Sequence, residues 1–284
     1  MSNMKLILTL LCAFAFAAVP LLAADAPSPL RIVQTKAGTH YAICAEKPAQ
    51  PAPTLFIIAG PMTSVAADKS RWFIATGDAL SKQGWLFVVL DPACEGYALK
   101  PGEPSSLAGW ATHAKNGTEF VKPYVESCRD VLDHLIAEGF TDPQRVAVEG
   151  VSRGGFCALQ FAAAEPRIKA VIGVSPVTNP LALKEFAGVT PPQIAVITLD
   201  QQLEKLAGRT IWMSIGNTDD RVSTDDCISF ARRLVATTRR LKPELKMIPV
   251  HLHVTASLGH GAPDGTYLAA AEFLLKQVPL LAKP

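Results

Sequence analysis

The sequence predicts a single α/β domain built on a doubly wound, mainly parallel sheet. Three observations lead to this prediction. Apolar runs typical of buried strands alternate with amphipathic runs of helical period along most of the chain. The 284 residues, 49% of them hydrophobic, suffice for one core without a second domain. Near the middle, a serine flanked by glycines stands between a predicted strand and a predicted helix.

The first 24 residues are typical of a secretory signal. Lys5 supplies the positive start, and the apolar run over 6–19 is too short for a permanent membrane span. Small residues at 23 and 24 predict cleavage near Ala24. We therefore expect export to the periplasm or the cell exterior, and a single mature domain over residues 25–284.

The predicted elements follow the chain in order. An antiparallel hairpin is expected over 30–46, where polar and apolar residues alternate around Gly38. Later apolar runs predict the strands of the sheet, at 55–58, 85–90, 146–148, 170–174, 211–215 and 246–254. Runs with apolar residues on one face predict helices, at 71–83, 125–138, 156–164 and 267–277.

Two segments break this alternation. Residues 97–119 are rich in Gly, Pro and Ser, and predict a long loop at the mouth of a site. Trp110 and His113 lie in it, where they either line a pocket or pack the loop. Residues 176–209 predict a small helical cap inserted over the site, or else a peripheral helix pair covering the sheet.

The pentapeptide Gly-Val-Ser-Arg-Gly at 150–154 follows the strand at 146–148 and precedes the helix at 156–164. In this context it predicts a nucleophile elbow, a strained turn that projects the Ser152 hydroxyl from the sheet edge. The glycines leave room where strand and helix nearly touch, and the helix points its positive dipole end at the hydroxyl.

A serine nucleophile needs a base that takes its proton and an acid that orients the base. In this architecture the acid and then the histidine follow the serine along the chain. Asp219, just beyond the strand at 211–215, is the predicted acid in preference to Asp220, although both are also ordinary turn residues. His260, between two glycines in the loop before the last helix, is the predicted base.

The remaining histidines give no second site. His251 and His253 share one face of a strand, where a polar patch is a better interpretation than a metal pair. His40, His113 and His134 are expected at the surface or in loops, without partners. We therefore expect neither a metal nor an organic cofactor.

Three motifs carry a resemblance to a known family. They are Gly-Val-Ser-Arg-Gly-Gly at 150–155, Gly-Asn-Thr-Asp-Asp-Arg-Val at 216–222 and Gly-His-Gly at 259–261. With them the chain resembles serine hydrolases of the α/β-hydrolase superfamily, on the branch of prolyl-oligopeptidase-like and dienelactone-hydrolase-like esterases. The resemblance implies the α/β-hydrolase fold from about residue 30 onward, and it makes the first aspartate of Asp-Asp-Arg-Val the triad acid.

Acyl transfer also needs two N–H donors for the developing oxyanion. The backbone N–H of Arg153 is the first. Relatives often have His-Gly-Gly where this chain has Ala-Gly-Pro at 59–61, and the proline has no N–H to donate. The N–H of Met62 is therefore predicted as the second donor, with the Gly60 N–H or the Thr63 hydroxyl as alternatives.

The charged residues say little about what the protein binds. The net charge of +2, without a basic cluster, gives no argument for nucleic-acid binding. The Arg153 side chain is expected to pair with Glu149 or another carboxylate, the alternative being an anionic group of a substrate.

Signal removal leaves an odd number of cysteines, which predicts at least one free thiol or an intermolecular bond. Cys157 is expected to be a small buried helix residue, and Cys94 could pair with Cys128.

The predicted function is hydrolysis of carboxylic esters by an exported enzyme, through an acyl-enzyme intermediate. The substrate would be a small-molecule or polymer-borne ester. A small peptidase or aminopeptidase of the prolyl-oligopeptidase-like type is the alternative. One catalytic domain accounts for the whole chain and leaves no room for a propeller that filters peptides, which favours the esterase. A non-catalytic binding protein is third, because all three triad residues are present.

Overall fold

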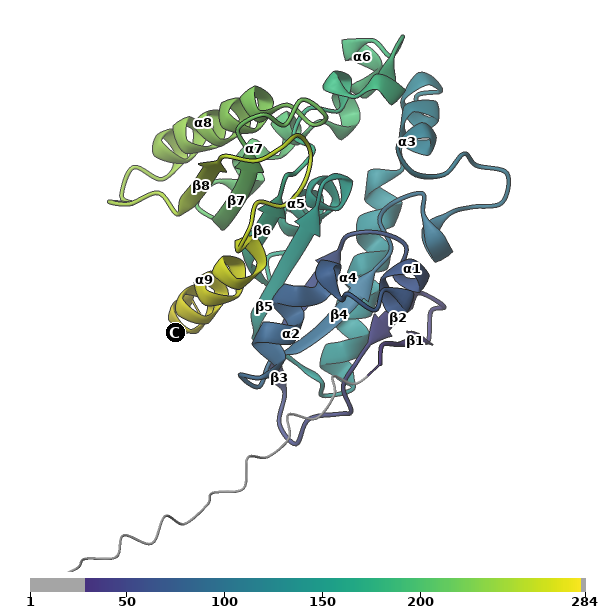
Figure 1. Ribbon diagram of the computed structural model, residues 1–284, viewed down its shortest axis with the longest axis vertical. Coiled ribbons are helices and arrows are strands. Elements are labelled where there is room, and N and C mark those ends of the chain that lie inside the picture. The colour runs from purple at the N-terminus through teal and green to yellow at the C-terminus, as the bar shows by residue number, and fades with distance from the viewer. Residues whose placement is uncertain (1–28, 282–284) are drawn as a thin grey trace, which may run out of the picture.

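An eight-stranded sheet runs through the middle of the protein (Figure 1). The structure, a computed structural model, describes residues 29–281, so the predicted signal segment lies outside the described residues. The strands occur in the spatial order β1-β2-β4-β3-β5-β6-β7-β8. They are β1 (Arg31–Gln34), β2 (His40–Ile43), β3 (Ala52–Ile58), β4 (Leu86–Leu90), β5 (Thr141–Val151), β6 (Ile168–Val174), β7 (Thr210–Gly216) and β8 (Val250–Thr255).

The pairing follows the prediction of a mainly parallel sheet. β1 and β2 form the antiparallel hairpin, and β2 joins β4 antiparallel. All pairs from β4 through β8 are parallel. Because parallel strands end at the same edge, residues that follow β3, β5, β6, β7 and β8 meet there.

Helices cover both faces of the sheet, each over its own apolar layer. In β3, Phe56 and Ile58 belong to one layer while Leu55 and Ile57 belong to the other, as alternation along a strand requires. The first layer includes residues of α3 (Ser106–Lys115), α4 (Val121–Ala137), α5 (Arg153–Ala164) and α8 (Thr224–Leu241). The second includes residues of α1 (Met62–Ala67), α2 (Ala75–Ser81) and α9 (Thr266–Leu281).

The fold confirms the predicted α/β architecture, with one local correction. The segment 97–119 is not a continuous loop, because it contains the short helix η2 (Gly96–Ala98) and the ten-residue helix α3. Leu107, Trp110 and Ala114 are buried on one face of α3, and the indole N–H of Trp110 donates to the carbonyl of Ala93 at 2.8 Å. Burial of this face outweighs the low helix propensity of the Gly and Ser residues.

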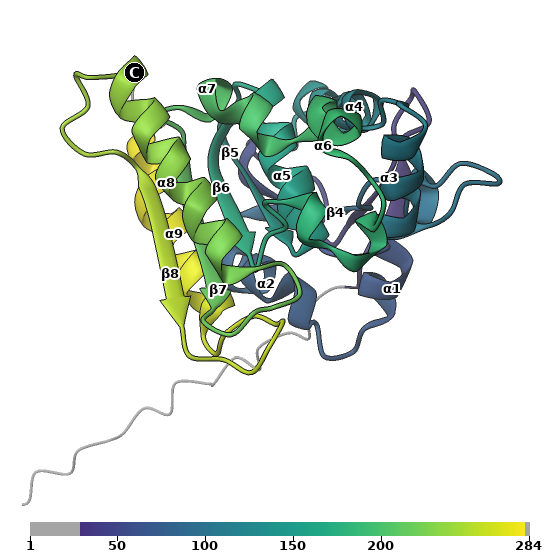
Figure 2. The ribbon, with the colours of Figure 1, turned by 90° about the horizontal axis from the view of Figure 1, so that it is seen from above.

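The segment 176–209 folds into a chain of short helices rather than two longer ones. Figure 2 shows α6 beside α3, which it contacts. Others in the segment contact α5 and α8. The members are η3 (Pro180–Ala182), η4 (Lys184–Phe186), α6 (Pro191–Ile194), η5 (Ala195–Ile197), η6 (Leu199–Gln202) and α7 (Leu203–Leu206), while η1 (Trp72–Ile74) precedes α2. The role of this segment as a specificity cap stays a prediction.

The cysteines of the described residues are all free thiols, so Cys94 and Cys128 do not form the disulfide considered above. Cys157 is buried in α5, at the position predicted for it. Within residues 29–281, no helix combines the length and the apolar character needed to cross a membrane.

Candidate active site

Ser152 occupies the turn between β5 and α5 with a strained backbone, φ 56° and ψ −118°. Few residues other than glycine adopt a positive φ, and such strain persists only where the surroundings impose it. A side chain at Gly154 would collide with the carbonyl of Ile58 in β3, and one at Gly150 with the carbonyl of Gly154. The two glycines therefore allow the close backbone contact that holds the turn.

The structure brings the three predicted catalytic side chains into one hydrogen-bonded chain. The Ser152 hydroxyl lies 3.0 Å from Nε2 of His260, and Nδ1 of the same ring lies 2.8 Å from a carboxylate oxygen of Asp219. The Asp219 side chain is fully buried, whereas Asp220 is exposed. The ring thus has one nitrogen on the carboxylate and the other on the hydroxyl, as general-base activation of a serine requires.

Backbone groups fix the orientation of the acid. The other carboxylate oxygen of Asp219 accepts hydrogen bonds from the N–H groups of Arg221 and Val222, each at 3.1 Å. The hydroxyl of Thr224 closes the loop by donating to the carbonyl of Gly216 at 2.6 Å. The run Asp-Asp-Arg-Val thus forms a turn around its first carboxylate.

The loop that carries His260 is tied to its neighbours on two sides. The hydroxyl of Ser175, after β6, donates to the carbonyl of Gly261 at 2.7 Å. The hydroxyl of Thr218, in the acid loop, donates to the carbonyl of Ser257 at 2.5 Å. These contacts hold the ring between hydroxyl and carboxylate, and the glycine-flanked loop needs them because it has no secondary structure of its own.

The structure corrects the prediction for the second oxyanion donor. The N–H of Met62 donates to the buried carboxylate of Asp91 at 2.6 Å, so it is not available to a substrate. Thr63 is exposed and absent from the pocket lining. Gly60 does line the pocket beside Ser152. Its backbone N–H donates to no acceptor among the described residues, so it is free to meet a substrate. The sequence alone could not reveal that Asp91 holds the competing acceptor.

The Arg153 side chain pairs with Glu95, not with Glu149. One guanidinium nitrogen lies 2.7 Å from a carboxylate oxygen of the buried Glu95, and a second nitrogen contacts the other oxygen. This partner raises the pKa of Arg153 above its usual value. Glu149 is instead fully buried, without a hydrogen-bond partner among the described residues, and burial raises the pKa of its carboxyl to about 8.

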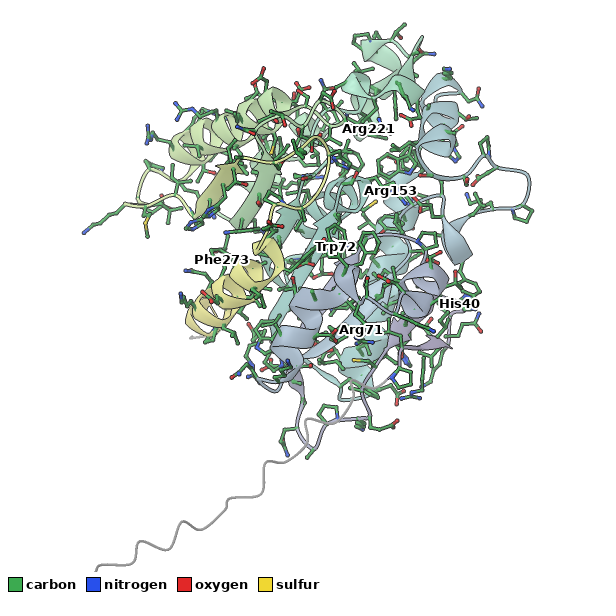
Figure 3. The ribbon with its side chains drawn as sticks, in the orientation of Figure 1. His40, Arg71, Trp72, Arg153, Arg221 and Phe273 are labelled. Carbon is green, nitrogen blue, oxygen red and sulfur yellow. The ribbon has the colours of Figure 1, made fainter. Side chains whose placement is uncertain are left out.

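A mainly apolar pocket of about 360 Å³ opens beside the serine. Trp72, 41% exposed, packs edge to face on Phe73 and on Tyr267 of α9, with ring centroids 4.9 and 5.0 Å apart. In Figure 3, Trp72 and Arg153 lie near the middle of the molecule, below Arg221. The lining comprises Ala59, Gly60, Pro61, Ser64, Val65, Trp72, Phe73, Val151, Ser152, Arg153, Ser175, His260, Gly261 and Ala262.

The other histidines have partners that the sequence did not reveal. His251 packs on Phe273, and His253 packs on Trp212, so both contribute to packing. His40 stacks on Tyr97 and His134 packs against Tyr41. His113 lies on α3 and forms an ion pair with Glu103, close to Cys94. The expectation that His40, His113 and His134 lack partners was therefore wrong.

Comparison with solved structures agrees with the fold. TT1662 from Thermus thermophilus superposes with a TM-score of 0.61 at 18% identity, over 88% of this chain and 98% of the other. Dipeptidyl peptidase 4 of Porphyromonas gingivalis gives 0.62 at 17%, over 87% of this chain and 35% of the peptidase, so the chain spans about a third of that protein. Acetyl xylan esterase 1 of a Thermoanaerobacterium species gives 0.55 at 18%, over 84% and 78%.

Sequence comparison identifies the family. No curated protein sequence matches the chain. The sequence profile of the prolyl oligopeptidase family matches residues 111–278, more than half of the chain, and includes all three residues of the hydrogen-bonded chain. The protein is therefore a serine hydrolase, and it belongs to the prolyl oligopeptidase family.

Proposed function

We propose that this serine hydrolase cleaves carboxylic esters, with Ser152 as nucleophile, His260 as base and Asp219 as the orienting acid. The observation that carries the proposal is the continuous hydrogen-bonded chain of these three side chains, which ends at a mainly apolar, aromatic-walled pocket. Such a pocket favours an uncharged apolar group on the substrate.

In the proposed mechanism each step of acyl transfer falls to one atom. The Ser152 hydroxyl attacks the acyl carbonyl while Nε2 of His260 takes its proton, and the buried Asp219 carboxylate stabilises the resulting imidazolium. The imidazolium then gives the proton to the departing alkoxide. A water molecule, activated by the same nitrogen, attacks the acyl-serine and releases the acid.

The proposed oxyanion donors are the N–H groups of Arg153 and Gly60. Arg153 is the first residue of α5, where the N–H has no partner within the helix and the dipole favours negative charge. The close contact of Gly154 with Ile58 brings the start of α5 against the end of β3, which Gly60 follows. In a crystal structure of a phosphonylated enzyme, the phosphonyl oxygen should therefore accept from these two groups and not from Met62.

The charge of the pocket favours esters over peptides with a free amino terminus. Binding a terminal ammonium calls for a carboxylate, and none lines the pocket among the described residues. Glu95, the carboxylate that contacts the pocket residue Arg153, is already engaged by that guanidinium. Turnover of a panel of amide substrates at rates matching those of esters would overturn this preference for esters.

The first test is labelling of the purified protein with a fluorophosphonate probe, with the modified peptide located by mass spectrometry. We expect one adduct, on Ser152, which is lost in Ser152→Ala and nearly lost in His260→Ala. Ser229→Ala, at an exposed serine of α8, is the matched control and should label like the wild type. A folded wild type that takes up no probe would contradict the catalytic role and favour a binding protein.

We also propose that the protein is exported, on the strength of the signal-like segment 1–24. Amino-terminal sequencing of the protein recovered from its host should begin at Asp25. Recovery of an uncleaved chain from the cytoplasm would overturn the proposal.

A further inference from the structure

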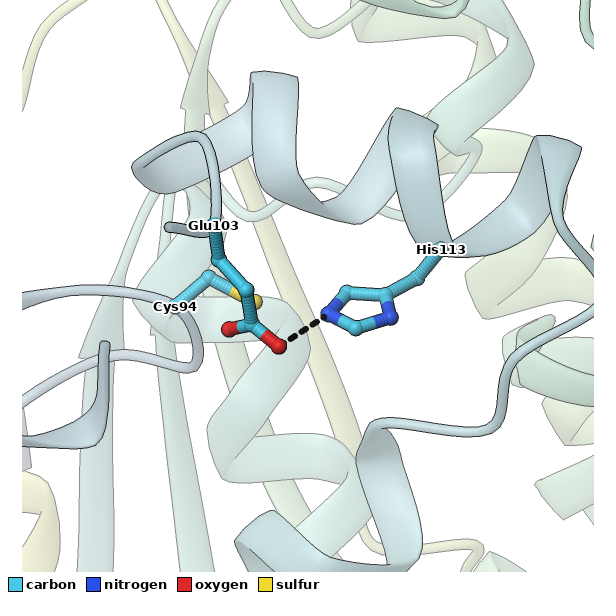
Figure 4. A group of neighbouring side chains, drawn as sticks. All are labelled: Cys94, Glu103 and His113. Carbon is cyan, nitrogen blue, oxygen red and sulfur yellow. Dashed lines mark ion pairs between the residues drawn. The ribbon is translucent and has the colours of Figure 1, made fainter. Parts of the chain in front are cut away.

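A second cluster of reactive side chains lies outside the pocket beside Ser152. Cys94 follows β4, Glu103 lies in the turn before α3, and His113 is on α3 itself. One donor atom from each, the sulfur, a carboxylate oxygen and a ring nitrogen, lies within 4.8 Å of the other two. Figure 4 shows the thiol and the carboxylate on the same side of the imidazole ring. The proposed ester hydrolysis uses none of the three.

The cluster is shielded from solvent and held in place. Cys94 is 5% exposed, and the side chains of His113 and Glu103 are 13% and 21% exposed. The backbone of Cys94 has a φ of 60°, a conformation that a non-glycine residue keeps only when its surroundings impose it.

Two hydrogen bonds supply that constraint on Cys94. Its carbonyl accepts the N–H of Ser106 at 2.8 Å, and the preceding carbonyl, that of Ala93, accepts the indole N–H of Trp110 at 2.8 Å. Because both donors belong to α3, the helix that carries His113 also positions Cys94.

The separations suit a small metal ion. Bond lengths of about 2.3 Å to sulfur and 2.0–2.2 Å to nitrogen or oxygen place tetrahedral ligands about 3.3–3.7 Å apart. The nitrogen of His113 and the oxygen of Glu103 are already 3.3 Å apart. The sulfur lies within 4.8 Å, so an inward shift of about 1 Å completes the set.

The donor types select among ions. A thiolate together with an imidazole suits Zn²⁺ or its neighbours in the first transition row, while Mg²⁺ and Ca²⁺ prefer sets made only of oxygen. A cavity of about 220 Å³ adjoins the three side chains and is also lined by Tyr97 and Lys100, which leaves room for a water molecule as fourth ligand.

We propose that Cys94, Glu103 and His113 bind one Zn²⁺ ion, with a water molecule from the adjoining cavity in the fourth position. On binding, the thiol loses its proton to solvent and the sulfur–zinc bond forms, so that uptake of the ion releases a proton and strengthens as the pH rises. The bound ion links the segment after β4 to α3, next to Glu95, which holds Arg153. It is a structural link rather than part of the ester hydrolysis.

The test uses Co²⁺ as a spectroscopic substitute for Zn²⁺ on the metal-free protein. We expect one Co²⁺ per chain, with a thiolate-to-cobalt charge-transfer band in the near ultraviolet and the intense visible bands of a tetrahedral site. One equivalent of Zn²⁺ should abolish both. Cys94→Ser should lose the charge-transfer band, whereas Cys44→Ser, at a thiol that lies outside the cluster, should keep it.

His113→Gln provides a second variant in case Cys94→Ser does not fold, as judged by circular dichroism. Loss of a metal ligand in this variant should weaken Co²⁺ binding more than loss of a residue that only hydrogen-bonds to a ligand, which typically costs about 10- to 100-fold in affinity. A folded wild type without a charge-transfer band, or a band that survives in Cys94→Ser, would overturn the proposal. Neither outcome bears on Ser152, because labelling by a fluorophosphonate needs no metal.

Discussion

Among residues 29–281, two imidazole–carboxylate pairs differ in what else the imidazole ring faces. In His260–Asp219, the two ring nitrogens face different partners, a buried carboxylate at 2.8 Å and the serine hydroxyl at 3.0 Å. In His113–Glu103, a ring nitrogen, a carboxylate oxygen 3.3 Å from it and the sulfur of Cys94 all lie within 4.8 Å of one another. The first arrangement can pass a proton along a line, while the second can surround an ion. Residue types alone do not distinguish these two roles, since the direction in which the ring nitrogens point decides between them.

The largest expected effect would separate the two pairs by activity. Ser152→Ala or His260→Ala should lower kcat for ester hydrolysis by about a million-fold, because nucleophile and base act as a unit. Treatment of the wild type with a chelator should leave turnover within the same order of magnitude. Initial rates on a chromogenic ester measure both, and His253→Ala is the matched histidine control. Comparable losses from chelation and from Ser152→Ala would break the comparison.

The next effect tests which carboxylate orients the base. Asp219→Asn should lower kcat/KM by about 10⁴-fold, because the amide cannot stabilise the imidazolium and favours the wrong tautomer. Asp220→Asn, at the exposed neighbouring position, should change kcat/KM little. Equal losses in the two variants, measured on the same ester, would show that the loop rather than the single carboxylate matters.

Glu149 extends the comparison of the two pairs, because it is a buried carboxyl group that has no imidazole partner among the described residues. Burial raises its pKa to about 8 from an ordinary value of 4.5. At any pH between these two pKa values, Glu149 is protonated in the native state and ionised in the unfolded state. The free energy of unfolding therefore falls as the pH rises through this window. The loss approaches about 5 kcal/mol as an upper bound.

Glu149→Gln removes this titrating group. The variant should gain stability over the wild type at pH 9 and show little advantage at pH 5, as measured by urea unfolding. Glu126→Gln, at an exposed position of α4, is the matched control. An unchanged pH slope in Glu149→Gln would contradict the account.

The smallest expected effect concerns the pocket wall. Trp72→Ala should lower kcat/KM for esters with a large apolar acyl group by roughly tenfold, and change acetate esters much less, because only the larger group contacts the ring. The Co²⁺ spectrum should be unaffected, since Trp72 lines the pocket beside Ser152 and not the cavity beside Cys94. Tyr267→Phe keeps the aromatic packing and is the control. An equal loss for acetate and large acyl esters would argue against a pocket role.

The sequence was sufficient for most of the fold and for the three side chains that the structure joins in one hydrogen-bonded chain. Ser152, Asp219 and His260 each follow a strand that its apolar run alone predicts. Parallel strands bring the residues that follow them to the same edge of the sheet. The elbow is also local, since its glycines, its strand and its helix are contiguous in the chain.

What the sequence could not supply depends on contacts between distant segments. Met62 looked like an available donor because Asp91, which accepts its N–H, lies 29 residues further on. His113 looked isolated because the Gly and Ser residues around it gave no sign of the helix α3. The burial of Trp110 in the structure shows which face of that helix packs against the core. The spacing of these residues in the sequence does not indicate which of them are in contact.

The contact between Gly154 and the carbonyl of Ile58 has a consequence for redesign. Backbone atoms of β3 and α5 set the separation between Ser152 and the strand end, and no side chain intervenes. The walls of the pocket, by contrast, are side chains such as Trp72 and Phe73 that come from a separate segment. Libraries restricted to those walls should therefore yield variants with new substrate ranges that keep the reactive centre intact, whereas any replacement of Gly154 should abolish it.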